Sequence, residues 1–181
     1  MTKSQFLVER NKRRKEIRDK VRFVIVIVIM LLAGIIPLGL KLESIRADNA
    51  DTWIDDEYVE YIKIIGEEKN ICPELVIALI ETESSGKADA VSPSGRCQGL
   101  MQLDCKYHDG NLFDWKHNID LGTDHLLRLF EKYEDPNIVL TVYNQGEHSK
   151  EGKSAIETGV GNSYATKIIK RANELERLHG K

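Results

Sequence analysis

The feature that most constrains how this chain can fold is an uninterrupted run of 18 uncharged residues, Phe23 to Leu40. A helix on the surface of a globular protein needs a polar face, and no polar side chain breaks this run. Its length is at the short end of what spans a bilayer as a helix. Residues 23–40 are therefore predicted to form a transmembrane signal-anchor.

The charges before this run predict its orientation. Residues 1–22 carry nine Lys or Arg against three Asp or Glu, a net charge of +6. A positive flank favours a cytoplasmic N-terminus and an exported C-terminal part, in a single-pass protein of the cell membrane. The alternative is a secreted protein with a cleaved signal peptide, whose apolar core is usually about 7–15 residues long. Only Ser44–Ala47 resembles a cleavage site.

The exported part of the chain is acidic. With −3 for the whole chain and +6 in the head, residues 41–181 carry −9. Such a surface lacks the basic stripe that neutralises phosphates, so no nucleic acid partner is expected. Glycan strands are compatible with it, because they are bound by hydrogen bonds and ring stacking. Residues 41–56 are predicted to be an extracytoplasmic stalk, and residues 57–181 a globular domain large enough for its own core.

The first half of this domain has the periodicity of helices. Apolar residues recur at a helical spacing between Glu57 and Lys69. A second helix is predicted from Cys72-Pro73 to the Ser84–Gly86 stop, since proline is tolerated at the first helical position. It is apolar nearly all round, so we expect it at the centre of the fold. A loop with turn chemistry at Ser92–Gly95 follows.

Three further helices are predicted downstream. One opens at Asn118 or Asp120, one at Asp135-Pro136, and the last at Asn162 or Ser163, because these side chains are good N-caps. Residues 146–161 are polar and rich in glycine, and are predicted to be a loop. No confident strand, βαβ alternation or internal repeat is visible in the sequence. The predicted fold class is mainly α.

Glu83, near the end of the second helix, is the candidate acid. Val76, Leu79 and Ile80 precede it by seven, four and three residues, so Glu83 shares their apolar face. Burial raises the pKa of a carboxyl, and a raised pKa suits an acid catalyst near neutral pH. The alternative is an exposed carboxylate on the last turn of the helix.

Two later segments can complete a site around Glu83. Gly99-Leu100-Met101-Gln102 can fold back over the helix end, with the Gln102 amide available to a sugar or to the acid. Met101 and Leu100 are expected mainly to seal one side. Tyr143-Asn144-x-Gly146 ends a predicted buried helix with a phenol, an amide and a flexible exit.

In this order the segments resemble the goose-type lysozyme and soluble lytic transglycosylase (SLT) superfamily, over roughly Glu57 to Gly180. The resemblance is carried by Glu83-Ser84, Ala90–Gly95, Gly99–Gln102, Tyr143-Asn144-x-Gly146 and Tyr164. It implies a lysozyme-like helical fold that cleaves the β-1,4 bond between N-acetylmuramic acid and N-acetylglucosamine in peptidoglycan.

The resemblance also implies roles for these residues. Glu83 would be the general acid and then the base of a lytic transglycosylase, which forms 1,6-anhydromuramic acid without a cofactor. Residues expected to bind the glycan are Ser84, Met101, Gln102, Tyr143 and Asn144, and Tyr164 is expected to support the acid.

Two alternatives to the lytic transglycosylase stay open. Asp104 directly follows Met-Gln-Leu, as in goose-type lysozymes, and would be the second carboxylate of a hydrolase. A different class is a non-catalytic scaffold that binds the cell wall. The predicted anchor and modest size favour a protein that opens the wall locally, with a secretion or conjugation complex as a partner.

The remaining reactive side chains are cysteines and histidines. Outside the cell, a disulfide between Cys97 and Cys105 is feasible, which leaves Cys72 unpaired. No spacing resembles that of a metal site. His125 lies on a helical apolar face and is expected to be a packed imidazole, and His108 lies in a loop with no role assigned.

Overall fold

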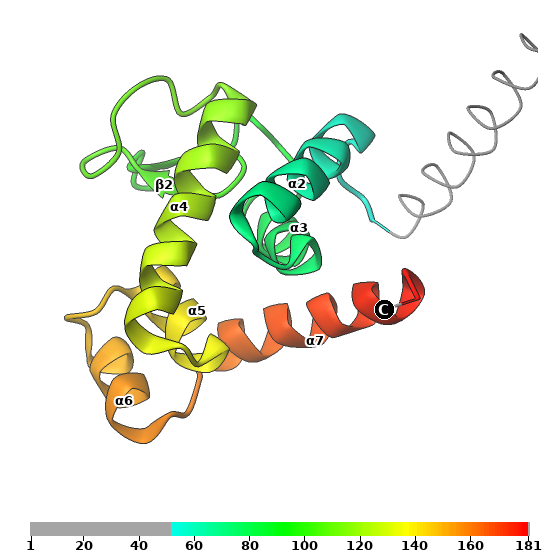
Figure 1. The fold of residues 1–181 in the computed structure, drawn as a ribbon. Coiled ribbons are helices and arrows are strands. Elements are labelled where there is room, and N and C mark those ends of the chain that lie inside the picture. The colour runs from blue at the N-terminus through cyan, green and yellow to red at the C-terminus, as the bar shows by residue number, and fades with distance from the viewer. Residues whose placement is uncertain (1–51, 181) are drawn as a thin grey trace, which may run out of the picture. The chain divides into compact units, whose positions relative to one another are not determined.

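The computed structural model of the protein describes residues 52–180. Along this part of the chain the elements are α2 (Asp56–Lys69), α3 (Pro73–Glu83), β1 (Cys97–Gln98), β2 (Leu103–Asp104), α4 (Trp115–Tyr133), α5 (Pro136–Gln145), α6 (Lys150–Thr158) and α7 (Ser163–Leu178) (Figure 1). The mainly helical fold class is confirmed.

Helix α3 is the centre of the core. Every residue from Glu74 to Glu81 is buried, as its apolar sequence predicted. Helix α7 packs along α3 and runs antiparallel to it: Tyr164 in the first turn of α7 contacts Glu83 at the end of α3, and Glu176 in the last turn contacts Cys72 at its start. The last turn of α3 is thus tied to the first turn of α7, and the start of α3 to the last turn of α7.

Helix α4 begins at Trp115, not at Asn118 or Asp120 as expected. The Asp114 side chain accepts hydrogen bonds from the backbone N–H of Lys116 at 3.1 Å and of His117 at 3.2 Å, so Asp114 is the N-cap. Asn118 is fully buried instead. Its side chain accepts from the backbone N–H of Met101 at 2.8 Å and so ties the loop before α4 to the helix.

Helix α6 was expected to be loop, and this expectation is wrong. Ser149 caps it by accepting a hydrogen bond from the backbone N–H of Gly152 at 2.8 Å, and Gly159 ends it in the left-handed conformation. Only Gly152 and Ala155 are buried in α6, so the helix shows no apolar stripe in the sequence. The predicted caps Asp135 of α5 and Asn162 of α7 are confirmed.

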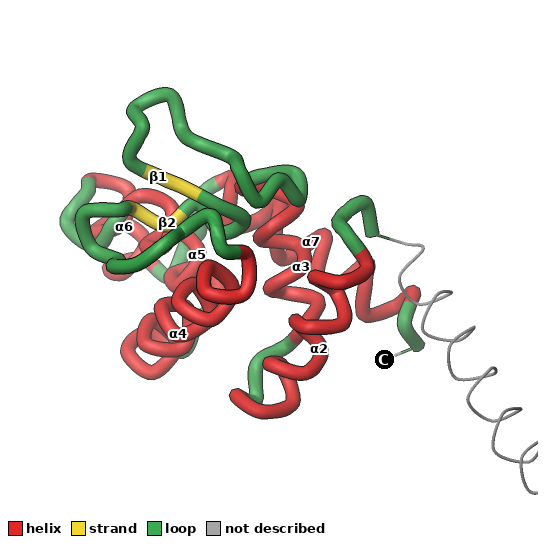
Figure 2. Tube along the Cα trace, turned by 90° about the horizontal axis from the view of Figure 1, so that it is seen from above, coloured by secondary structure: helices red, strands yellow, loops and turns green. Residues whose placement is uncertain are grey.

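A long loop between α3 and α4 contains the two short strands, which sequence periodicity did not predict. β1 and β2 are antiparallel, with Cys97 opposite Asp104 and Gln98 opposite Leu103. Two residues a strand are too few to show an alternating pattern. Figure 2 shows this loop on the side of α5 and α6, away from the C-terminal end of the described chain.

The predicted head, membrane segment and most of the stalk fall in residues 1–51, outside the described part, and stay predictions. Within residues 52–180, no helix has both the length and the apolar content needed to cross a bilayer. At the end of the predicted stalk, Ile54 is buried in the core.

Candidate active site

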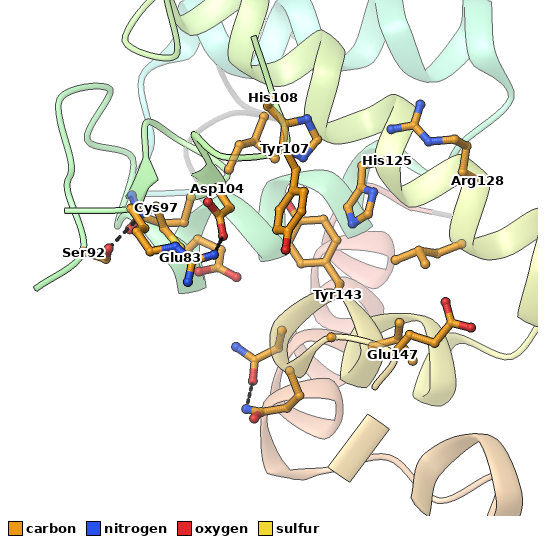
Figure 3. A pocket seen from close by; sticks show the side chains of 18 residues that line it. Glu83, Ser92, Cys97, Asp104, Tyr107, His108, His125, Arg128, Tyr143 and Glu147 are labelled. Atoms are coloured by element: carbon orange, nitrogen blue, oxygen red, sulfur yellow. Dashed lines mark hydrogen bonds and ion pairs between the residues drawn. The ribbon is translucent and has the colours of Figure 1, made fainter. Parts of the chain in front are cut away.

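A cleft of about 760 Å³ lies between the end of α3, the β1–β2 loop, α4 and the end of α5. Figure 3 shows Glu83 and Asp104 at one end of it, rings in the middle, and Arg128 with Glu147 at the other end. The predicted site residues that line the cleft are Glu83, Gln102, Asp104, Tyr143 and Asn144.

Glu83 is the last residue of α3 and is only partly exposed, at the wall of the cleft. Burial raises the pKa of its carboxyl, which outweighs the lowering by a hydrogen bond from Tyr164 and by the charge of Lys167. The Tyr164 hydroxyl, from the first turn of α7, donates to Glu83 Oε1. The carboxyl is therefore held in place by a neutral group that leaves it able to carry a proton.

Gln102 lies in the wall beside Glu83 and holds the loop in its shape. Its side-chain amide donates to the backbone carbonyls of Gly99 at 2.9 Å and Ala90 at 3.1 Å. Gly99 has φ +77°, and a Cβ there would lie 2.2 Å from the Leu112 carbonyl oxygen and from Asn118 Nδ2. Only glycine fits this position, which explains why the segment Gly99–Gln102 begins with it.

Tyr143 joins α5 to the same loop. Its hydroxyl donates a hydrogen bond to the backbone carbonyl of Met101 at 2.9 Å. Burial, and then the charge of Glu83, raise the pKa of this phenol well above its ordinary value, so Tyr143 stays protonated. Tyr143 lines the cleft beside His125, and the centroids of the two rings are 5.3 Å apart.

Asp104 lies in the cleft but is already engaged. Its carboxylate forms an ion pair with Arg96 and accepts from the backbone N–H of Lys106 at 2.9 Å. Partial burial acts to raise the pKa of Asp104, but the Lys106 N–H and the Arg96 guanidinium outweigh it, so the pKa is lowered. The pKa values of Glu83 and Asp104 are thus shifted in opposite directions, Glu83 toward the acid form and Asp104 toward the anion.

Residues 60–164 match the family model of the transglycosylase SLT domain, over more than half of the chain. The chain belongs to the SLT transglycosylase family. The resemblance inferred from the motifs is therefore confirmed, and with it a lytic transglycosylase-type function that acts on peptidoglycan. No curated protein sequence matches the chain.

Two residues expected to line the groove of this SLT domain lie behind it. Met101 is fully buried and packs against α4, where a Cβ on Gly122 would lie 2.3 Å from its Sδ atom. Ser84 is buried, and its hydroxyl donates to the Ile80 carbonyl at 3.2 Å. Neither side chain lines the cleft, so each acts on it through the backbone that it fixes.

The disulfide considered between Cys97 and Cys105 of the SLT domain is not formed, and both cysteines are free. Cys97 is paired with Asp104 across the two strands, so Cys105 is one position beyond the pair. Neighbouring side chains on a strand point to opposite faces, which directs the two sulfurs apart. Cys97 lines the cleft, whereas Cys105 is exposed and does not.

Several cleft residues of the SLT domain had no role assigned from the sequence. Tyr107 lines the middle of the cleft and is 70% exposed. His108 and His125 lie beside it, with ring centroids 5.6 Å apart, and burial lowers the pKa of His125 to about 4. Arg96, Arg128 and Glu147 complete the lining. Helical spacing from His125 was the one signal for Arg128, because residues i and i+3 share a face.

Among residues 52–180, one group of metal-donor atoms converges, and it lies outside the cleft. Cys72 Sγ is 3.3 Å from Glu74 Oε2 and 3.2 Å from Glu176 Oε1. Burial and these two carboxylates raise the pKa of Cys72 to about 12, although the backbone N–H of Leu75 acts to lower it. The thiol therefore keeps its proton and serves as a hydrogen-bond donor between α3 and α7.

Proposed function

We propose that this protein is a peptidoglycan lytic transglycosylase in which Glu83 acts first as acid and then as base. The observation that carries the proposal is a carboxyl in the cleft whose pKa burial raises, and which a neutral phenol holds. An SLT-family cleft with such a group is suited to cleavage of the β-1,4 bond between N-acetylmuramic acid and N-acetylglucosamine.

The proposed reaction needs no water and no second carboxylate. The Glu83 carboxyl donates its proton to the glycosidic oxygen, and the bond from that oxygen to the anomeric carbon of muramic acid breaks. The resulting carboxylate then takes the proton of the muramic acid 6-hydroxyl, whose oxygen bonds to the anomeric carbon. The products are a free 4-hydroxyl on N-acetylglucosamine and a 1,6-anhydro ring, and Glu83 has regained its proton.

The state of Asp104 supports this route over hydrolysis. A hydrolase would use Asp104 to take a proton from water, but its carboxylate is paired with Arg96 and its pKa is lowered, which makes it a poor base. Goose-type muramidase activity is the second candidate, because Asp104 does line the same cleft as Glu83. A scaffold without activity has no need of a carboxyl with a raised pKa.

Mass spectrometry of the muropeptides tests the three functions. The full-length protein in detergent is incubated with purified peptidoglycan beside its Glu83→Gln variant. Products that end in 1,6-anhydromuramic acid, lighter by one water than reducing ends and absent with the variant, support the lytic transglycosylase. Reducing-end products support the muramidase, and wall binding without any product supports the scaffold.

We further propose that the enzyme is anchored in the cell membrane by residues 23–40, with its SLT domain outside, and that it opens the wall locally for a secretion or conjugation complex. The apolar run and the basic head support the anchor. Membrane fractionation tests it: release of the protein into the medium, without residues 1–47, would refute the anchor and favour the signal peptide.

A further inference from the structure

The end of the cleft that is far from Glu83 carries a positive charge with no role in the proposed reaction. Arg128 and His125 are three residues apart on α4, and both side chains line the cleft. Figure 3 shows Arg128 and Glu83 on opposite sides of Tyr107, Tyr143 and His125. A glycan strand along the rings would therefore reach Arg128 some distance from the bond that is cut.

The other charged groups of the cleft are already paired or neutral. Arg96 is paired with Asp104, and Glu147 with Lys132. Burial, and then nearby positive charge, lower the pKa of both His108 and His125, so the two imidazoles are neutral near pH 7. Within residues 52–180, no ion pair or hydrogen bond holds the exposed Arg128 guanidinium. It is therefore the cation that this end of the cleft offers to a ligand.

We propose that Arg128 binds a carboxylate of the stem peptide on N-acetylmuramic acid, so that the enzyme prefers glycan strands that still carry their peptides. The proposal rests on the proposed function. The repeating sugars are uncharged, whereas the peptide attached to the lactyl group of muramic acid carries carboxylates. A guanidinium presents paired N–H groups that match the two oxygens of a carboxylate, a fit that a lysine ammonium lacks.

Phosphodiester-linked polymers attached to muramic acid are another source of negative charge on the same strands. Hydrofluoric acid removes these polymers and leaves the peptides, whereas an N-acetylmuramyl-L-alanine amidase removes the peptides and leaves a free lactyl carboxylate on each muramic acid. Carbodiimide coupling to methylamine then converts that carboxylate into a neutral amide, and strands treated in both ways are called stripped. Three preparations thus separate the two sources: untreated soluble strands, acid-treated strands, and acid-treated strands stripped of peptide.

The test compares the full-length enzyme with Arg128→Gln and Arg128→Lys on the three preparations. On acid-treated strands with peptides we expect Arg128→Gln to lose about fivefold in kcat/KM, through a higher KM, since an exposed pair contributes modestly. Arg128→Lys should recover only part of the loss. On stripped strands the variants should equal the parent. Arg177→Gln, which removes an exposed guanidinium of α7 outside the cleft, is the matched control and should change nothing.

The contrary outcomes are distinct. Equal losses on stripped and peptide-bearing strands, or no preference in the parent, would overturn the proposal for Arg128 and leave the proposed function standing. A loss confined to untreated strands would assign the anion to the phosphodiester polymer and also overturn it. If the parent cuts no strand, the proposed function fails. Co-sedimentation of Glu83→Gln, with and without Arg128→Gln, on peptide-bearing and stripped strands then still decides whether Arg128 binds the peptide.

Discussion

Glu81 and Glu83 are two carboxyls on one helix, two residues apart, and they differ in their partners and in their access to the cleft. Glu81 is paired with Arg171 of α7 through two hydrogen bonds, at 2.7 Å and 3.1 Å, and its side chain is 1% exposed. Glu83 receives a hydrogen bond from the phenol of Tyr164, in the first turn of the same α7. Each of these two carboxyls is thus matched to a partner on α7.

The partner decides what each carboxyl can do. The Arg171 guanidinium donates to both carboxylate oxygens of Glu81, so this carboxylate joins α3 to α7. A phenol is neutral, and burial then raises the pKa of Glu83 in spite of its hydrogen bond. The difference teaches that burial alone does not mark a catalytic acid. In the proposed mechanism, the acid is the carboxyl whose partner is uncharged and which lines the cleft.

The largest effect is expected from Glu83→Gln. The amide keeps the size of the side chain but has no acidic proton, so kcat should fall by about 1,000-fold or more, within the range seen for loss of acid catalysis. Release of anhydromuropeptides measures the rate, and circular dichroism with thermal unfolding checks the fold. Activity within tenfold of the parent would remove Glu83 from the proposed role.

Glu81→Gln should do the opposite: it should lower the free energy of unfolding and leave the rate of glycan cleavage unchanged. Removal of one partner from a buried ion pair costs about 3–5 kcal/mol when the other charge is left unpaired. Arg171 also pairs with Glu174 at 3.1 Å, so we expect a smaller loss of about 2 kcal/mol. Denaturant titration measures the free energy of unfolding, and the Glu83→Gln variant is the matched control. A stability loss below about 1 kcal/mol, or a rate loss as large as that of Glu83→Gln, would break the comparison.

Tyr164→Phe should shift the pH dependence and lower the rate about tenfold, as expected for a residue that positions the acid. The Tyr164 hydroxyl lowers the pKa of Glu83, so its removal raises that pKa further. A general acid works in its protonated form, and the alkaline limb of the pH–rate profile should therefore move to higher pH. An alkaline limb that stays in place or moves to lower pH would contradict the assigned contact.

The smallest effect in this series is expected from Asp104→Asn. As a lytic transglycosylase, the enzyme should lose about threefold in kcat, because the variant loses the ion pair with Arg96 that braces the loop, and loses no reacting group. The products should still end in anhydromuramic acid. If Asp104→Asn instead abolished turnover while Arg96→Gln did not, Asp104 would be acting as the base of a muramidase.

Much of the site could be predicted from the sequence because it follows local rules. The apolar stripe before Glu83 and the cap signatures at Asp135 and Asn162 are set by residues within one or two turns. The Gly99–Gln102 segment was also recognised from the sequence. It begins with glycine because a Cβ at this position would collide with Leu112 and Asn118.

The rest depends on contacts between distant residues. Glu81 and Arg171 are 90 positions apart, and no periodicity connects them. The free state of Cys97 and Cys105 follows from a strand register only two residues long. Met101, expected to seal one side of the groove, lies wholly in the core because α4 offers Gly122 there. Helix α6 buries too little apolar surface to leave a stripe.

The antiparallel course of α7 along α3 gives proteolysis from the C-terminus a fixed order of consequences. Of the residues that contact α3 or its N-cap, trimming removes His179 first, whose ring forms a hydrogen bond of 3.0 Å with Glu74. Glu176 and Arg171 follow, and Tyr164 is removed last. The early cuts expose the start of α3, far from the cleft. An exopeptidase should therefore lower the stability of the protein before it disturbs the cleft, so under the proposed function partly clipped molecules would still cut glycan until they unfold.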